Sequence, residues 1–305
     1  MENYVIGIGE VLWDCFKEER KLGGAPANFA YHVSQFGLNG CAISAIADDE
    51  LGEEIVEKFE KVGLNHILPV VNQPTGIVKV TLKDGQPQYE ICQGVAWDNI
   101  PLTKEMLHVA KNAKAICFGS LAQRSQASRK TIHAVLDAAP KSALRVFDIN
   151  LRQHWYSADV IAESLQRANI LKINDEELDV LATMLLGVPT TPGQLIAENE
   201  EKTRMVCLNL LVKYDLQMII LTCGARCSYV FKEGEESYLP TPRVKLADAV
   251  GAGDSFTATF VAQLLLGKSI PEAHKKAVDV AAYVCTQKGA MPVLPEELKK
   301  YNNNC

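Results

Sequence analysis

Short apolar runs alternate with amphipathic stretches along most of the chain. Runs of strand length lie at residues 4–9, 41–46, 115–119, 144–149, 169–173 and 217–222. Stretches such as 51–62 and 125–138 repeat their apolar residues with the period of a helix. Nearly continuous apolar strands separated by helices are typical of a parallel sheet covered on both faces. The pattern therefore predicts an α/β fold with a doubly wound, mostly parallel sheet flanked by helices.

Residues 70–97 depart from this alternation. Apolar residues at every second position flank the pair Asp84-Gly85, which is a strong signal for a hairpin turn. Residues 11–22 are a second short candidate for β structure. We expect the two segments to form a small antiparallel β-sheet that acts as a lid within a single domain of residues 1–305. The alternative is that they extend the edge of the main sheet.

Charge and composition narrow the classes of partner. The 305 residues are 48% hydrophobic and 22% charged, an ordinary globular composition, and the net charge is −6. Because the chain lacks a basic cluster, binding to a nucleic-acid backbone is not expected. An anionic substrate would have to be met by a local arrangement of groups.

The cysteines and the apolar runs indicate the compartment. Most of the nine cysteines lie inside apolar runs, where cysteine behaves as a small hydrophobic residue. The sequence starts without a secretory signal, and no apolar run approaches the ~20 residues that span a bilayer. We therefore expect a cytoplasmic protein with no membrane partner.

The segment at residues 248–254, Asp-Ala-Val-Gly-Ala-Gly-Asp, carries the clearest chemistry. Gly251, Ala252 and Gly253 precede an amphipathic run, so they should present unpaired amides at a helix N-terminus, where an anion is favoured. A phosphoryl group in transfer needs such a site. Asp254 is placed to take a proton from an attacking hydroxyl. The alternative is that Asp254 only caps the helix.

Two glycine motifs together resemble the signatures of the ribokinase-like, or phosphofructokinase-B, family of carbohydrate kinases. One is the segment 248–254, and the other is Leu-Gly-Gly-Ala-Pro-Ala-Asn-Phe-Ala at residues 22–30. Residues 9–14, Gly-Glu-Val-Leu-Trp-Asp, are most similar to bacterial fructokinases. The resemblance covers essentially the whole chain. It implies a ribokinase-like fold and transfer of the γ-phosphate of ATP to a hydroxyl of a small sugar, fructose first.

The resemblance also assigns the reacting groups. It implies that Asp254 is the base and that the amides of residues 251–253 hold the charge on the moving phosphate. It further implies that Asp14, Gly24 and Asn28 hydrogen-bond the hydroxyls of the sugar. Asn28 also follows a Gly-Gly pair by one helical turn and offers both a donor and an acceptor, although capping or a turn is an alternative role.

Arg152 belongs to the segment Asp-Ile-Asn-Leu-Arg at residues 148–152, which follows a predicted strand. It therefore falls at the carboxyl end of the sheet, where α/β proteins bind their ligands. In the family this segment faces the substrate and the phosphates. Arg152 could clamp a phosphate with two hydrogen bonds, and the alternative is an ordinary surface arginine.

Two further segments resemble the nucleotide and magnesium elements of the family. Asn174 and Glu177 match its Asn-x-x-Glu element, in which the glutamate helps to hold Mg²⁺ through water. On its own, Glu177 is a good residue for the first turn of a helix. Thr222 and Gly224, with Asn174 and Gly253, match contacts to the nucleotide phosphates.

Asp248, Val250 and the backbone near Gly289 resemble a monovalent-cation site of many members, which binds K⁺. Two departures stand out: Cys227 replaces a common glycine, and residues 93–97 lack the basic pattern that contacts the sugar in standard fructokinases.

The identity of the substrate is therefore open, with ribose, another sugar or a nucleoside as alternatives to fructose. A regulator that binds sugar without catalysis is a different class, but it would not need Asp254. Lids of this family often pair, so the resemblance also allows a homodimer through the lid, which the sequence does not decide.

Overall fold

The computed structural model describes residues 3–17, 19–83 and 86–300. Nine strands of these residues form the central sheet, in the order β15-β14-β13-β12-β11-β10-β1-β4-β6. Their bounds are β1 Tyr4–Ile8, β4 Asn39–Ile43, β6 Asn65–Ile67, β10 Ala113–Phe118, β11 Leu144–Asp148, β12 Ile170–Asn174, β13 Met218–Thr222, β14 Cys227–Lys232 and β15 Glu235–Pro240. The pairs from β6 to β13 are parallel and the two pairs from β13 to β15 are antiparallel. The predicted mostly parallel sheet is confirmed.

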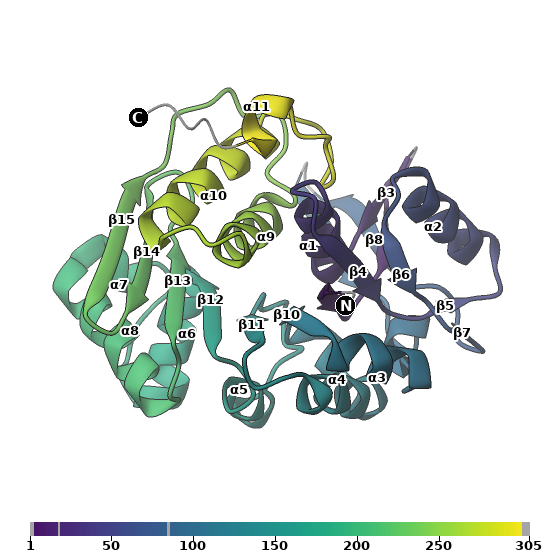
Figure 1. Ribbon diagram of the computed structural model, residues 1–305, viewed down its shortest axis with the longest axis horizontal. Coiled ribbons are helices and arrows are strands. Elements are labelled where there is room, and N and C mark those ends of the chain that lie inside the picture. Colours follow the sequence, from purple (N-terminus) through teal and green to yellow (C-terminus); the bar gives the residue numbers. More distant parts are fainter. Residues whose placement is uncertain (1–2, 18, 84–85, 301–305) are drawn as a thin grey trace.

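Helices cover both faces of this sheet (Figure 1). One layer holds α1 Ala25–Ser34, α9 Ala252–Leu265 and α10 Ile270–Val284, and the other holds α3 Lys104–Lys111, α4 Gln126–Ala138, α5 Ala158–Leu165, α6 Asp175–Leu186 and α8 Glu200–Lys213. Alternate residues of a strand point to opposite faces of the sheet, so they belong to different hydrophobic clusters. Ile219 and Leu221 pack with the second layer, whereas Met218 and Ile220 pack with the first. Continuous apolar strands are the consequence of burial on both faces.

The order of the strands reverses between β1 and β10. From β1 the chain proceeds to β4 and β6 on one side, whereas β10 to β13 follow one another on the other side. In open α/β sheets, ligands bind outside the carboxyl ends of the strands at such a point of reversal. The residues that follow β1 and β10 are therefore expected to border the functional site.

A second, smaller sheet stands apart from the main sheet. It contains β2 Leu12–Cys15, β3 Arg20–Gly23, β8 Ile77–Lys83 and β9 Gln86–Ile91, in the order β3-β2-β8-β9. A separate small sheet was predicted, and an edge extension of the main sheet is excluded. The outer two pairings are antiparallel, and the central pairing of β2 with β8 is parallel. The predicted turn Asp84-Gly85 lies outside the described residues.

The lid range predicted from residue 70 begins too early. β7 Val70–Val71 pairs with β5 Ile46–Ala47 in a third, two-stranded sheet. The amides of Ser44 and Ile46 donate to the carbonyls of Ile67 and Pro69 at 3.2 Å each, so this pair continues the ladder of β4 and β6. The remaining elements are α2 Glu50–Lys61, α7 Gln194–Glu198, α11 Glu296–Lys299 and the short 3-10 helices η1 Ala96–Asn99 and η2 Leu121–Arg124.

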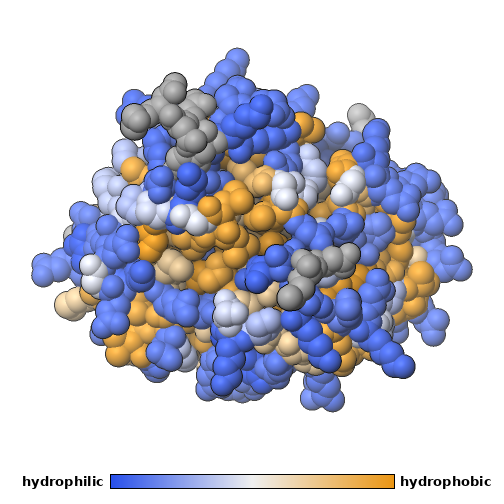
Figure 2. Space-filling view, viewed as in Figure 1, coloured by the Kyte–Doolittle hydropathy of each residue, from blue (hydrophilic) through white to orange (hydrophobic). Residues whose placement is uncertain are grey.

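Hydrophilic residues cover most of the face seen in Figure 2, and hydrophobic residues gather across its middle, between the two helical layers. Among the described residues, no helix has both the length and the apolar character needed to span a bilayer.

Candidate active site

Asp254 and Asn28 meet at the start of two neighbouring helices. Asp254 lies in the first turn of α9 and Asn28 in α1. The side-chain nitrogen Nδ2 of Asn28 donates to Oδ2 of Asp254 at 2.7 Å. Since a carboxylate only accepts, this contact fixes the orientation of the Asn28 amide. Gly251, and not Asp254, occupies the N-cap position of α9. The carboxylate of Asp254 accepts from Asn28, so Asp254 does not act as the cap of this helix.

The environment of Asp254 suits a general base. Burial and the nearby charge of Asp148 raise the pKa of Asp254 to about 6, although Asn28, Lys172 and Arg152 act in the opposite direction. A base with a pKa slightly below neutral is mostly ionised at pH 7 and still binds a proton well. The side chain is half-buried, so it keeps access to a substrate.

The turn before Asp254 exposes backbone amides. Gly251 has φ +78°, and a Cβ at this position would lie 2.7 Å from the main chain of Ala290, so only glycine fits. The amide of Ala252 donates to the carbonyl of Ala249 at 3.3 Å. No acceptor among the described residues pairs with the amides of Gly251 and Gly253. These amides stay available for an anion at the positive end of α9.

Lys172 adds a positive charge beside this turn. A Cβ built on Gly253 would lie 3.2 Å from Nζ of Lys172, which is itself 3.4 Å from Oδ1 of Asp148. Burial alone would lower the pKa of Lys172, but the carboxylates of Asp148, Glu177 and Asp254 outweigh it and raise the pKa. The ammonium group is therefore charged although the residue is only 7% exposed. The sequence analysis missed Lys172, whose signal was a lone lysine inside an apolar strand.

Asp14 lies in β2 of the small sheet, and Gly24 lies between β3 and α1. A Cβ built on Gly23 would lie 3.0 Å from Oδ2 of Asp14, so the carboxylate of Asp14 lies close to Gly23. Burial raises the pKa of Asp14, whereas Lys21 and Arg152 lower it. Nζ of Lys21 lies 3.6 Å from Oδ2 of Asp248, which precedes α9. The small sheet is thus tied to the loop that leads to Asp254.

Arg152 lies on a loop with strained backbone. Asn150 and Gln153 have φ values of +44° and +49°, which few residues other than glycine adopt. Such strain is often found at functional sites. Arg152 itself is exposed, and its charge lowers the pKa of Asp14 and Asp254. It therefore lies within electrostatic reach of one predicted sugar contact, Asp14, and of Asp254.

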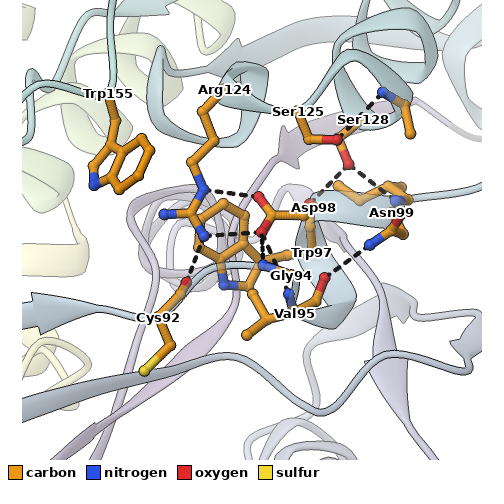
Figure 3. A network of polar contacts seen from close by, with 12 residues as sticks. Cys92, Gly94, Val95, Trp97, Asp98, Asn99, Arg124, Ser125, Ser128 and Trp155 are labelled. Carbon is orange, nitrogen blue, oxygen red and sulfur yellow. Dashed lines mark hydrogen bonds and ion pairs between the residues drawn. The ribbon is translucent and has the colours of Figure 1, made fainter.

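A buried polar network holds this region together (Figure 3). Arg124 donates to both carboxylate oxygens of Asp98 at 2.8 and 2.9 Å and to the carbonyl of Cys92 at 2.5 Å. Its guanidinium group lies between the rings of Trp97 and Trp155, 4.0 and 4.9 Å from their centroids. The network ties the end of β9 to η2 and to the loop after Arg152.

Residues 94, 95 and 97 take part in this network. The amide of Gly94 donates to Oδ2 of Asp98 at 2.9 Å, and Trp97 covers one face of the Arg124 guanidinium. On the other side, Gln153 donates to the carbonyl of Tyr89 at 2.6 Å. The loop of Arg152 is therefore connected to β9 of the small sheet.

Glu177 and Asn174 form a reciprocal cap at the start of α6. Oδ1 of Asn174 accepts from the amide of Glu177 at 2.8 Å, and Oε2 of Glu177 accepts from the amide of Asn174 at 2.9 Å. The other oxygen of Glu177 accepts from the amide of Leu151 at 2.9 Å. Burial raises the pKa of Glu177, and Lys172 partly opposes it. Glu177 therefore does stabilise the first turn of its helix, which was the alternative role.

The same residue fits an indirect role with a metal ion. Each carboxylate oxygen of Glu177 keeps a second lone pair that can accept from a metal-bound water. No three His, Cys, Asp or Glu side chains within residues 3–17, 19–83 and 86–300 gather into a direct metal site. A metal here would be held by phosphate oxygens and water, as magnesium prefers.

Two of the predicted nucleotide contacts, Thr222 and Gly224, lie at the end of β13 and in the turn that follows it. Oγ1 of Thr222 donates to the carbonyl of Ile173 at 3.4 Å, and Gly224 has φ +55°. The amide of Cys223 donates to the carbonyl of Cys227 at 2.9 Å and closes the turn. Cys227 is buried in the core and has no positive φ, so this position does not require a glycine.

The predicted monovalent-cation residues also come together. Oδ1 of Asp248 accepts from the amide of Val250 at 3.1 Å, and Oδ2 accepts from the amide of Gly289 at 3.3 Å. Burial alone would raise the pKa of Asp248, but these hydrogen bonds and Lys21 outweigh it and lower the pKa. The carboxylate therefore fixes the loop before the amide turn of α9.

Comparisons with known proteins identify the family of the chain. Residues 3–297 match a family model described as pfkB family carbohydrate kinase. A protein of Pyrococcus horikoshii named as a sugar kinase is 29% identical, over 97% of this chain and 95% of its own length. A protein of Arabidopsis thaliana named as a fructokinase is 30% identical, over 90% of this chain and 85% of its own.

A crystal structure of a fructokinase from Xylella fastidiosa with bound ATP has the same fold. It superposes with a TM-score of 0.81 at 19% sequence identity and covers 97% of this chain and 96% of its own. At this identity the likeness shows the fold alone. The predicted resemblance to ribokinase-like carbohydrate kinases is confirmed by the family match.

Proposed function

Because the chain belongs to the pfkB family of carbohydrate kinases, we propose that it transfers the γ-phosphate of ATP to a hydroxyl of fructose. The observation that carries the proposal is the 2.7 Å contact between Asn28 and Asp254 beside the open amides of α9. This contact supports a role of Asp254 as a base beside a site for an anion. The relatives named as fructokinase and sugar kinase support the class of substrate.

Each group has a defined part in the transfer. Asp14 and Asn28 hold hydroxyls of the sugar, and Asp254 takes the proton of the reacting hydroxyl. The oxygen then bonds to the γ-phosphorus while the bond to the bridging oxygen of ADP breaks. The amide of Gly253 and the ammonium of Lys172 meet the charge on the transferred group.

A bound Mg²⁺ would neutralise the phosphates and align them, and Glu177 would hold one of its waters. Thr222 and Gly224 would border the nucleotide phosphates, and Arg152 would clamp one of them. A K⁺ ion near Asp248, Val250 and Gly289 would stabilise the same amide turn.

The small sheet would act as a lid that excludes water when sugar binds. Lys21 on β3 already reaches Asp248 at 3.6 Å, and Gln153 reaches the carbonyl of Tyr89 on β9. A pairing of two lids into a homodimer stays a prediction, which light scattering of the purified chain would test. A cytoplasmic location also stays a prediction, and the free thiols of the described cysteines suit a reducing compartment.

A coupled assay of ADP release tests the function. The purified chain is incubated with ATP, Mg²⁺ and D-fructose, D-glucose, D-ribose or adenosine, with K⁺ or Na⁺ as the monovalent cation. We expect release that depends on sugar and is fastest with D-fructose. Equal ATP hydrolysis with and without sugar would refute transfer to a sugar. Sugar binding without ADP release would identify a regulator.

A further inference from the structure

Glu10 lies where the order of the strands reverses, directly after β1. Its backbone is held in place by a close approach, because a Cβ built on Gly24 would lie 2.3 Å from the carbonyl oxygen of Glu10. The residue is only 3% exposed. Glu10 is therefore buried at the point of the sheet where the candidate site is expected, although no motif predicted a role for it.

The carboxyl of Glu10 is incompletely paired. The carboxylate oxygen Oε2 is buried and has no hydrogen-bond partner among the described residues. Burial raises the pKa of Glu10 to about 7, while the charge of Arg152 lowers it and those of Asp254 and Asp148 raise it. These three neighbours are all groups of the candidate site. An unpaired buried carboxyl costs stability, so the fold alone gives no reason for it.

A second open acceptor comes from Asn28. Nδ2 of Asn28 uses one of its two hydrogens for Asp254, and the buried oxygen Oδ1 has no partner among the described residues. The two open oxygens of Asn28 and Glu10 come from elements that touch at Gly24. A ligand with several hydroxyl groups is the chemistry that would satisfy two unpaired acceptors.

We propose that Glu10 is a further sugar-binding residue, whose Oε2 accepts a hydrogen bond from a sugar hydroxyl other than the one that reacts. The inference rests on the proposed kinase function and deepens it. Glu10 takes no part in the proton transfer, which belongs to Asp254. Its open oxygen is satisfied only when sugar is bound, so it selects for a hydroxyl at one position of the substrate.

Variants at Glu10 separate this role from a structural one. Glu10→Met removes the acceptor and the buried charge, whereas Glu10→Gln keeps an acceptor oxygen. Thr259→Val is a matched control, because Thr259 has a fully buried hydroxyl with no partner in the described residues and lies deeper in α9. Affinities for D-fructose, D-ribose, D-glucose and ATP are measured by calorimetry, and KM, kcat and Tm are measured in parallel.

For a sugar that the wild type binds, we expect Glu10→Met to weaken affinity about 10- to 100-fold, which corresponds to the loss of one hydrogen bond to a charged group. KM for sugar should rise more than kcat falls, and ATP affinity should stay within about twofold. Tm should stay equal or rise, because an unpaired buried group is removed. Glu10→Gln should recover part of the affinity, and Thr259→Val should bind as the wild type does.

Wild-type sugar affinity in Glu10→Met would overturn the inference. So would a parallel loss of Tm and of both affinities, or a Glu10→Met chain that fails to fold while Glu10→Gln folds and binds, because these results assign a structural role. A wild type that binds none of the three sugars would instead refute the proposed function. The two failures are therefore distinguishable.

Discussion

Replacement of Asp254 by Asn removes the proposed base with little change of shape. The amide oxygen of the new side chain can still accept from Nδ2 of Asn28, which lies 2.7 Å from the carboxylate in the wild type. The change therefore keeps the contact between α1 and α9. It removes only the ability to bind a proton and the negative charge.

The size of the effect follows from the pKa of Asp254. With a pKa of about 6, about nine in ten molecules carry the ionised base at pH 7, so nearly the whole wild-type population is active. General-base catalysis contributes roughly 100- to 10,000-fold, which corresponds to about 3 to 5 kcal/mol in the barrier. Because the ionised form reacts, wild-type kcat/KM should fall about tenfold per pH unit below about pH 6.

The assay is sugar-dependent ADP release from pH 5 to pH 9, with calorimetry for sugar and ATP binding. Asp279→Asn is the matched control, since Asp279 lies on α10 and its carboxylate accepts from the exposed Lys275 at 2.6 Å. We expect Asp254→Asn to lose turnover but to bind both ligands. Turnover within about tenfold of the wild type, or an unchanged acid limb, would refute the assignment of the base.

Three further predictions concern the turn, the network and stability. Gly251→Ala should lower kcat at least about tenfold because its Cβ would meet a neighbouring loop; Gly267→Ala, with a similar φ of +80° and open space around it, is the control for backbone strain. Asp98→Ala should lower the free energy of unfolding in urea by about 3 to 5 kcal/mol, because it leaves the buried charge of Arg124 unpaired, and a loss below about 1 kcal/mol would contradict this. Burial raises the pKa of Glu10 from 4.5 to about 7, so ionisation of this carboxyl opposes folding. The free energy of unfolding of the wild type should therefore fall, relative to that of Glu10→Gln, by about 3 kcal/mol between pH 4.5 and pH 8. Parallel pH curves of the two proteins would argue against this.

The sequence was sufficient for the plan of the main sheet and for the motif that carries the chemistry. Strands buried on both faces are apolar at every position, and helices between them repeat with a period of 3.6, so both are readable without coordinates. Gly251 and Asp254 stood out because a tight turn before a helix constrains the residue types locally. The separate small sheet was also readable, because strong alternation and a turn signal are local properties.

Contacts between distant residues were decided only by the tertiary structure. Lys172 in β12 and Glu10 after β1 look like ordinary polar residues in the sequence, and their roles depend on neighbours from α9 and from the loop of Arg152. The ion pair of Arg124 and Asp98 also joins residues that are 26 positions apart in the sequence. Burial and charge pairing depend on all groups that surround a residue in three dimensions, whereas motifs depend only on neighbours along the chain. The sequence therefore determined which groups are present, and the fold decided which of them interact.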